Sequence, residues 1–161
     1  MIWIAATTRD FAQARALFEE YAAWLKVDLC FQGFADELAT LPGGYAQPLG
    51  RLLLASCGSA TDAADGCIAL RPIDIEGVAP ASVGEVKRLY VRPTAQRQGA
   101  GSLLAQSLID EARSIGYREL KLDTLDWMTS ARALYTRLGF RECAPYYHNP
   151  LPGAVYMSLT F

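Results

Sequence analysis

The spacing of hydrophobic residues predicts a set of short β-strands along the chain. These segments are rich in aliphatic, β-branched and aromatic residues, and Gly, Pro or small polar residues bound them, as is typical of strands. In the last segment, Val155, Met157, Leu159 and Phe161 are expected to share one side, because side chains alternate along a strand. The expected strands are Ile2–Ala6, Arg51–Ser56, Cys67–Ile73, Glu85–Val91, Glu119–Asp123 and Ala154–Phe161.

Helices are predicted where apolar residues recur at intervals of three and four positions. Between Phe11 and Leu25 this spacing gives one apolar stripe, and Thr8 or Asp10 is expected to cap the start of that helix. A glycine follows each of the last two helices, where the left-handed C-cap conformation favours it. The expected helices lie within Thr8–Leu25, Phe31–Leu41, Gly99–Ile115 and Ala131–Leu138, with Gly116 and Gly139 after the last two.

The order of these elements, β-α-α-β-β-β-α-β-α-β(β), predicts an α/β domain with an α+β type of mixed sheet. Strands joined by short loops form hairpins and strands joined through a helix form crossovers, so antiparallel and parallel pairs are expected together. The chain of 161 residues matches the usual size of one domain, which is about 150 residues. We therefore expect a single domain over residues 1–161.

The composition is that of an ordinary globular protein. Lys and Arg number 15 against 17 Asp and Glu, for a net charge of −2, with 52% hydrophobic and 20% charged residues. This balance excludes a disordered chain and a nucleic-acid-binding protein that depends on bulk positive charge. Met1–Ala6 lacks the length and basic flank of a signal peptide, and no apolar run approaches the ~20 residues that cross a bilayer. We expect a cytoplasmic protein with neither a nucleic-acid nor a membrane partner.

Neither a disulfide framework nor a metal site is expected. The cysteines, at Cys30, Cys57, Cys67 and Cys143, form no C-x-x-C pair. His148 is the only histidine, so the chain lacks the His/Cys cluster that zinc requires. A Ser-His-Asp hydrolase is also disfavoured, because no G-x-S-x-G motif occurs. We expect free thiols and no bound metal.

The segment Leu89–Leu104 carries the strongest chemical pattern in the chain. It comprises the end of a strand, a short loop and the start of a helix, where the first amides have no partner within the helix. Gly99 and Gly101 lack a Cβ, so the main chain can approach a bulky anion there. Arg92 and Arg97 add positive charge. This arrangement predicts a site for a phosphate or diphosphate group.

Two common phosphate-binding motifs do not fit this segment. A P-loop requires Gly-Lys-Ser or Gly-Lys-Thr, which the chain lacks. The dinucleotide fingerprint requires a third glycine where Leu104 stands. What remains is Gln96-x-x-Gly99-x-Gly101 after a strand, and this pattern resembles motif A of the GNAT superfamily of acyl-CoA-dependent N-acetyltransferases.

Other segments strengthen the resemblance to the GNAT superfamily. Ala131–Phe140 is similar to the family's A-x-x-L-Y-x-x-x-G-F segment, and the order of elements matches the family topology. Leu41–Tyr45, Glu85–Val91, Leu122–Leu125 and Pro145–Pro150 resemble a bacterial branch of small GNAT proteins. The resemblance covers nearly the whole chain. It implies a GNAT-like fold with a splayed central strand pair, acetyl-CoA or CoA as the bound cofactor, and transfer of an acetyl group to a primary amine.

The resemblance also implies which residues hold the cofactor. The diphosphate would meet the amides of the loop and helix start, and the pantetheine arm would pair with the exposed strand edge. There, main-chain groups of Leu89 and Val91 can polarise the thioester carbonyl. Met128 stands where many family members carry an asparagine that helps to hold the arm. The expected cofactor-binding residues are Leu89, Tyr90, Val91, Gln96, Arg97, Gln98, Gly99, Ala100, Gly101, Ser102 and Tyr135.

Glu85 and Tyr135 are the candidate catalytic residues. A primary ammonium has a pKa near 10, so its attack on a thioester at neutral pH requires a base. Glu85 stands where some GNAT members carry a catalytic glutamate, and it shares strand parity with Leu89 unless a bulge changes the phase. The alternative is a surface carboxylate, solvated or paired with Lys87 or Arg88. Tyr135 matches the family tyrosine that can protonate the departing thiolate, and its alternative is a core aromatic.

The acceptor pocket falls in the least patterned parts of the chain. In the family, the region between the first helices and the second strand shapes this pocket, and the acceptor is a small molecule or a peptide with an amine. Asp123 can bind a cationic acceptor or cap the turn after its strand, and His148 can line the pocket or be simply exposed. The candidates are Phe31, Phe34, Tyr45, Asp123, Tyr146, Tyr147 and His148.

Two other functions are compatible with the sequence. An acyl-CoA sensor, or degenerate GNAT protein, would hold CoA without transferring the acyl group, and the presence of both Glu85 and Tyr135 favours the enzyme. A nucleotide-phosphate binder would be protected by nucleotides rather than by CoA, but the chain has no base-recognition motif. Dimers are common in the family, which leaves a homodimer open.

Overall fold

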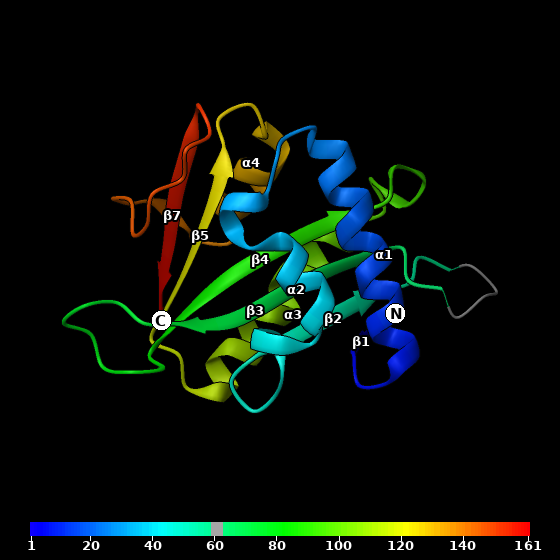
Figure 1. Cartoon of the computed structure of the whole chain (residues 1–161), viewed down its shortest axis with the longest axis horizontal. Helices are drawn as coiled ribbons and strands as arrows, with labels where there is room; N and C mark the ends of the chain where they lie inside the picture. Colours follow the sequence, from blue (N-terminus) through cyan, green and yellow to red (C-terminus); the bar gives the residue numbers. More distant parts are fainter. Residues whose placement is uncertain (59–62) are drawn as a thin grey trace.

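The fold is a seven-stranded mixed sheet with helices on both faces (Figure 1). It is seen in a computed structural model that describes residues 1–58 and 63–161. The small and polar stretch Cys57–Gly66 also predicts a hairpin loop, and its residues 59–62 lie outside the described residues. The strands are β1 (Ile2–Ile4), β2 (Arg51–Ala55), β3 (Gly66–Ile73), β4 (Val83–Val91), β5 (Glu119–Leu125), β6 (Arg141–Glu142) and β7 (Ala154–Thr160).

The strand order is β1-β2-β3-β4-β5-β7-β6. Every neighbouring pair is antiparallel except β4 and β5, which are parallel and connected through a helix. The sheet is therefore mixed, as the element order predicted. The helices are α1 (Thr8–Leu25), α2 (Phe34–Thr40), α3 (Ala100–Ile115) and α4 (Thr129–Arg137), with 3-10 turns η1 (Cys30–Gln32), η2 (Gly43–Tyr45) and η3 (Pro93–Ala95).

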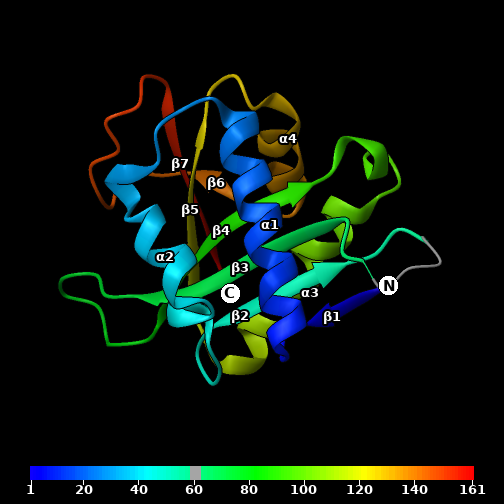
Figure 2. The ribbon, with the colours of Figure 1, turned by 45° about the vertical axis from the view of Figure 1, so that its right-hand side comes forward.

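Each face of the sheet has its own apolar layer. Helices α1 and α2 cover one face, and α3 and α4 cover the other (Figures 1 and 2). Phe18 of α1 packs in one layer with Tyr90, while Leu108 of α3 packs in the other with Leu70 and Val86. Because consecutive residues of β3 and β4 enter opposite layers, both faces of these central strands are buried.

Helix α1 begins with a reciprocal cap. The N-cap is Thr7, not Thr8 or Asp10 as the sequence predicted, and its hydroxyl accepts a hydrogen bond from the Asp10 amide at 3.1 Å. The Asp10 carboxylate accepts one from the Thr7 amide at 2.9 Å. Burial would raise the pKa of Asp10, but the hydrogen bonds that its carboxylate accepts from the Ala6 amide, the Trp3 indole and Thr7 lower it to about 2. The cap thus fixes where α1 starts over the sheet.

The expected helix Phe31–Leu41 is divided at Gly33. This glycine has a φ of 68°, in the left-handed region, so η1 ends there and α2 starts after it. The division places Gln32 on a separate turn from Glu37. Both side chains reach the same charged residue of β4, as described below.

A β-bulge in β4 changes which residues face α3. The register of β3 against β4 shifts around Arg88, whose φ is 60°. Val86 packs in the layer under α3 and so does Leu89, although unbroken alternation would turn Leu89 to the other face. Glu85 therefore does not share a face with Leu89. This corrects the simple parity between them, which the sequence predicted only for a strand without a bulge.

The remaining differences from the predicted elements lie near their ends. Strand β7 stops at Thr160, so Phe161 is outside the strand, and its ring lies 4.9 Å from the Arg113 guanidinium. Strand β6 supplies the additional strand that the predicted order allowed. Its two residues, Arg141 and Glu142, are exposed, so no apolar pattern could locate it.

Several general features follow from the described part of the chain. No helix there combines the length and the apolar character needed to cross a bilayer. Within the same residues, no group of three or more His, Cys, Asp or Glu side chains is placed to hold a metal ion. Cys30, Cys57, Cys67 and Cys143 are free cysteines.

Candidate functional site

Strands β4 and β5 separate in the middle of the sheet. They pair over three positions, ending at Glu85 opposite Lys121, and then diverge (Figure 1). Strand β4 keeps its pairing with β3 as far as Val91, so its other edge borders the opening. The main chain of β4 from Leu89 onward thus has no partner in β5. This confirms the splayed strand pair that the resemblance implied.

The loop after β4 enters α3 through a turn with unpaired amides. Gly99 is the N-cap of α3, with a φ of 81° and no side-chain cap. In the described part of the chain, the amides from Arg97 to Ser102 donate to no acceptor, and Leu103 is the first to bond, to the Gly99 carbonyl at 3.0 Å. A Cβ on Gly99 would meet no heavy atom within 4 Å, so the approach is open. Such a turn at the positive end of a helix suits an anion.

Two side chains beside this turn are held by the protein itself. Arg92 pairs with Glu20 of α1 at 2.7 Å, so its charge is not directed at the turn as the sequence predicted. The Gln96 side chain donates to the Val91 carbonyl at 2.9 Å and ties the loop to the end of β4. Arg97 is exposed, with a φ of 63°, and is the basic side chain within the turn itself.

A cavity, here called the slot, occupies the opening between β4 and β5. Leu25, Leu29 and Leu125 form a third apolar cluster on its wall. Charged groups enter it from both strands, so the slot is mixed in character. It is lined by Tyr21, Leu25, Val27, Leu29, Gln32, Val86, Lys87, Arg88, Leu89, Asp123, Thr124, Leu125, Met128, Ala131, Tyr135, Asn149 and Leu151.

Tyr135 lines the slot from α4. Its ring is 7% exposed and meets Phe140 edge-to-face at 5.5 Å, as expected of a core aromatic. Its hydroxyl has no hydrogen-bond partner among the described residues. Every fully buried polar side-chain atom among these residues does have a partner, so the Tyr135 hydroxyl is not fully buried and reaches the slot. Burial raises the pKa of Tyr135, which keeps the hydroxyl protonated at neutral pH. The ring thus belongs to the core while the hydroxyl belongs to the slot.

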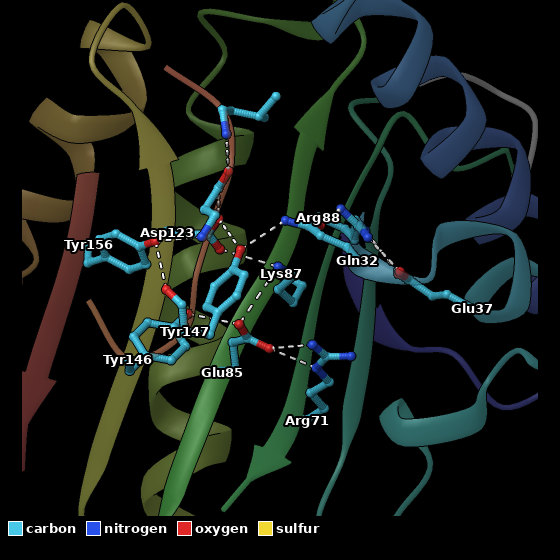
Figure 3. A network of polar contacts seen from close by, with 12 residues as sticks. Gln32, Glu37, Arg71, Glu85, Lys87, Arg88, Asp123, Tyr146, Tyr147 and Tyr156 are labelled. Carbon is cyan, nitrogen blue, oxygen red and sulfur yellow. Dashed lines mark hydrogen bonds and ion pairs between the residues drawn. The ribbon is translucent and has the colours of Figure 1, made fainter. Parts of the chain in front are cut away.

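Glu85 lies in a buried polar cluster between β3, β4 and the chain after β6 (Figure 3). It is 2% exposed, so the alternative of a solvated surface carboxylate is wrong. Arg71 of β3 places Nε and Nη2 each 2.7 Å from one carboxylate oxygen. Tyr146 donates its hydroxyl to the other oxygen at 2.8 Å, and Lys87 lies 3.7 Å from that oxygen. Both oxygens of Glu85 therefore have partners.

Asp123 of β5 is the second carboxylate of this cluster. It accepts hydrogen bonds from Tyr147 at 2.6 Å, Asn149 at 2.8 Å and Lys87 at 3.3 Å (Figure 3). Burial would raise the pKa of Asp123, but the charge of Lys87 and these bonds outweigh it and hold the pKa below its usual value. Asp123 is thus an ionised group facing the slot, and its carboxylate is bonded to this cluster. Lys87 bridges it to Glu85.

A second cavity, here called the outer pocket, lies beside Glu85. Lys87 and Gln32 line both the outer pocket and the slot, so they stand between the two. Gln32 donates to the Tyr147 hydroxyl at 3.1 Å and accepts from Arg88 at 2.9 Å (Figure 3). The outer pocket is lined by Phe31, Gln32, Arg71, Ile73, Asp74, Ile75, Glu85, Lys87, Tyr146 and Tyr147.

Arg88, the residue at the bulge, is fixed by α2. Its Nε donates to Glu37 at 2.9 Å, and its guanidinium lies 5.1 Å from the Phe34 ring. Burial would lower the pKa of Arg88, but Glu37 more than offsets it and raises the pKa. Arg88 therefore pairs with Glu37 and not with Glu85. Phe34, a predicted acceptor residue, packs against the Arg88 guanidinium and lines neither the slot nor the outer pocket.

The predicted acceptor residues divide into two groups. Phe31, Tyr146 and Tyr147 line the outer pocket and Asp123 lines the slot, so the fold brings these together. For Tyr146 and Tyr147, burial and the nearby carboxylates raise the pKa, so both hydroxyls stay protonated and donate.

Two predicted acceptor residues lie away from these cavities. Tyr45 is 4% exposed, packs edge-to-face on Phe18, and donates to Glu37 at 2.7 Å. It is a core residue that supports Glu37, the partner of Arg88. His148 is exposed and borders neither the slot nor the outer pocket.

Several residues of the site carry no strong pattern in the sequence. Arg71 has the clearest signal, since it is a charged residue inside the otherwise apolar strand β3. Gln32 stands in a turn without any motif. Trp24 and Trp127 border a groove beside the slot, and nothing in the sequence pairs residues so far apart.

Comparison with known proteins places this chain in a family. The model of the Acetyltransferase (GNAT) family matches residues 32–140. The match spans more than half of the chain and includes the split strands, the turn into α3 and helix α4. The chain belongs to the GNAT family of acetyltransferases, as the sequence resemblance implied.

Two relatives agree with this assignment. An N-acetyltransferase of Schizosaccharomyces pombe is 39% identical over 151 residues, covering 94% of this chain and 88% of the relative. An IAA acetyltransferase of Azospirillum brasilense is 38% identical over 93 residues, covering 57% of this chain and 58% of the relative. The class of activity shared by these relatives is acetyl transfer.

Solved structures agree on the fold. An acyl-CoA N-acyltransferase from Klebsiella pneumoniae superposes with a TM-score of 0.73 and 28% identity, covering 99% of this chain and 96% of that one. An acetyltransferase from Streptococcus agalactiae has a TM-score of 0.78 with 18% identity, covering 100% and 98%. The NatC complex, bound to Gag peptide and CoA, contains a chain with a TM-score of 0.71 and 16% identity, covering 100% and 98%. The expected fold class is confirmed.

Proposed function

We propose that this protein transfers the acetyl group of acetyl-CoA to a primary amine, by direct attack in a ternary complex. One observation carries the proposal: unpaired amides at the start of α3 follow a strand whose free edge leads into the slot. A thioester on a linear arm with a diphosphate at its other end matches both features. Membership of the GNAT family and the CoA in the NatC structure support this choice of donor.

The turn into α3 is the proposed diphosphate site. Its amides, from Arg97 through Ser102, are free to donate, and Gly99 and Gly101 place no side chain over them. Arg97 would add a positive charge, while Gln98 and Ala100 would contribute through the main chain. Gln96 would act indirectly, because its side chain holds the loop against β4.

The edge of β4 is the proposed site of the thioester. A main-chain amide at Leu89, Tyr90 or Val91 would polarise the carbonyl and stabilise the oxyanion that forms during attack. Tyr135 would donate to the departing sulfur, because its hydroxyl is protonated, unpartnered and inside the slot. The thiol that leaves has an ordinary pKa of about 8.5, so a nearby donor assists its departure.

The outer pocket is the proposed entry for the amine. The ammonium first gives one proton to the Tyr146 oxygen while the Tyr146 proton moves to Glu85, which leaves a neutral nitrogen to attack the thioester carbonyl. The N–C bond forms and the C–S bond breaks, the Tyr135 proton passes to the sulfur, and the second N–H proton of the nitrogen replaces it on Tyr135, so the products are an amide and the CoA thiol. Asp123, which stays ionised, would help to hold the incoming ammonium before it loses its proton.

An acyl-CoA sensor is the second candidate, and one observation favours it. Both oxygens of Glu85 are already bonded, to Arg71 and to Tyr146. A proton arriving at Glu85 must therefore share a site with an existing partner. In a sensor the same cluster would only hold β3, β4 and β5 together, with no turnover.

Ligand-dependent melting tests the donor, and thiol release tests the transfer. A ligand at 100 times its dissociation constant adds about 2.7 kcal/mol to the free energy of unfolding. Acetyl-CoA and CoA are expected to raise the melting temperature, and ATP and NAD are not. The opposite pattern would overturn the proposal. A panel of amines with acetyl-CoA then identifies the enzyme by free thiol release, whereas protection without release identifies the sensor.

A further inference from the structure

Two exposed tryptophans lie against each other beside the split strands. Trp24 is near the end of α1 and is 44% exposed, and Trp127 is in the turn between β5 and α4 and is 50% exposed. Their ring centroids are 5.7 Å apart with an interplanar angle of 50°. Because clustered exposed aromatic surface marks binding sites, a ligand is expected to cover this pair.

These rings form the outer wall of a groove whose floor is the free edge of β4. Leu89 and Val91 line the groove, and the first turn of α4 closes its other side. Leu89 and Met128 line both the groove and the slot, so the two spaces are continuous. The groove therefore combines two aromatic faces with main-chain groups of β4 that are not paired with β5.

Both indole N–H groups can donate a hydrogen bond to a ligand. Neither indole N–H has an acceptor among the described residues, whereas the Trp3 indole donates to Asp10 at 3.0 Å. Tyr21 stacks against Trp24 at 6.3 Å and lies 6.0 Å from the Tyr90 ring of β4. This aromatic row fixes Trp24 to the sheet and leaves its outer face open.

We propose that Trp24 and Trp127 clamp the pantetheine arm of the acyl-CoA. The arm alternates amides with methylene groups, so its amides can pair with the β4 edge and the indole N–H groups while its methylenes lie on the rings. This assignment rests on the proposed function, since the arm enters only if CoA binds. The amine acceptor is not the occupant, because the groove and the outer pocket share no lining residue.

The test compares two ligands that differ by the arm. Calorimetric titration uses CoA and adenosine 3′-phosphate 5′-diphosphate, which keeps the diphosphate and lacks the arm. The Trp24→Ala/Trp127→Ala variant is expected to bind CoA about tenfold more weakly and the armless nucleotide within about twofold of wild type. Val78→Ser, which removes another 44% exposed side chain, and Trp3→Phe are expected to leave both affinities unchanged. Trp127→Ser alone replaces the double variant if the latter does not fold.

Fluorescence and sedimentation complete the test. CoA is expected to alter the indole emission of wild type and of Trp3→Phe, and the armless nucleotide is not. Equal CoA affinity in wild type and the double variant would overturn the clamp, and so would equal weakening of both ligands. A dimer that dissociates in the variant with CoA affinity unchanged would assign the pair to a second copy of the chain. A wild type that binds no CoA would remove the proposed function as well.

Discussion

The two halves of β4 differ in what they offer a substrate. Beyond the bulge at Arg88, the donor end presents main-chain groups: the free strand edge and the amides that open α3. Before the bulge, the acceptor end presents side chains that come from β3, β4, β5, η1 and the chain after β6 (Figure 3). One site depends on the course of the backbone, and the other depends on tertiary packing.

This difference has consequences for mutation. At the donor end a side chain that blocks or repels the ligand can lower affinity while the fold remains intact, because the amides bond to nothing else in the described chain. In the acceptor cluster the polar side chains bond to one another, and Lys87, for example, contacts both Glu85 and Asp123. Removing one partner there leaves a buried group unpaired, which costs stability as well as activity.

The largest expected effect comes from a charge at the donor end. Gly99→Asp places a carboxylate at the N-cap of α3, where the φ of 81° is one that aspartate and asparagine adopt more readily than most other residues. Its repulsion of the diphosphate is expected to weaken CoA binding about 100-fold, while the left-handed backbone position lowers the free energy of unfolding by about 1 kcal/mol in this variant and in its control alike. Gly99→Asn is the matched control of equal size, and calorimetry that gave both variants the same affinity would contradict a diphosphate at this turn.

A comparable effect is expected on turnover from Tyr135→Phe. The change keeps the ring against Phe140 and removes only the hydroxyl that reaches the slot. Steady-state kinetics should show kcat lowered about 100-fold, within the usual range for a general acid, while CoA affinity stays near wild type. Tyr117→Phe is the control, because its hydroxyl bonds the Leu49 carbonyl away from the slot. An unchanged kcat would return Tyr135 to a purely structural role.

A pH-dependent loss is expected from Glu85→Gln. Glutamine cannot take the proton, so activity should fall about 30-fold near neutral pH and approach wild type toward the amine pKa near 10, where the acceptor deprotonates unaided. The pH profile of kcat/KM measures this convergence. Glu111→Gln is the matched control, since Glu111 pairs with Arg51 and neither residue borders the slot or the outer pocket. Parallel profiles for Glu85→Gln and wild type would remove Glu85 as the base.

A smaller effect is expected on stability from Asp123→Asn. The pKa of Asp123 is held below its usual value, so its carboxylate stabilises the fold above the ordinary carboxyl pKa of about 4. That contribution is lost as the pH falls through the lowered pKa. Urea unfolding should show the variant less stable by about 1–2 kcal/mol at pH 7, with the difference shrinking in acid. A difference that grew on acidification would contradict the assigned direction.

The smallest expected effects on CoA affinity come from replacing Arg97 and Arg92, and they differ between the two arginines. Arg97→Gln is expected to weaken CoA binding about threefold, because Arg97 is the exposed basic residue of the turn. Arg92→Gln is expected to change it less than about twofold and to lose under ~1 kcal/mol of stability with its partially exposed partner Glu20. Equal losses of affinity would show that Arg92 leaves Glu20 to reach the ligand.

The same comparison explains what the sequence could predict. The donor end follows from local features, since Gly99, Gly101 and the strand before them lie within one short segment. The acceptor end does not, because Arg71, Gln32 and Tyr147 meet only when distant segments pack together. The bulge at Arg88 is equally invisible in the apolar pattern, and it alone moves Leu89 to the face opposite Glu85.

The direct test of the central claim is a crystal structure of the protein with acetyl-CoA. The diphosphate oxygens are expected within hydrogen-bonding distance of the amides from Arg97 to Ser102, with the arm along the β4 edge and the sulfur near the Tyr135 hydroxyl. Density for the cofactor anywhere else, with that turn left vacant, would contradict a diphosphate site at the start of α3.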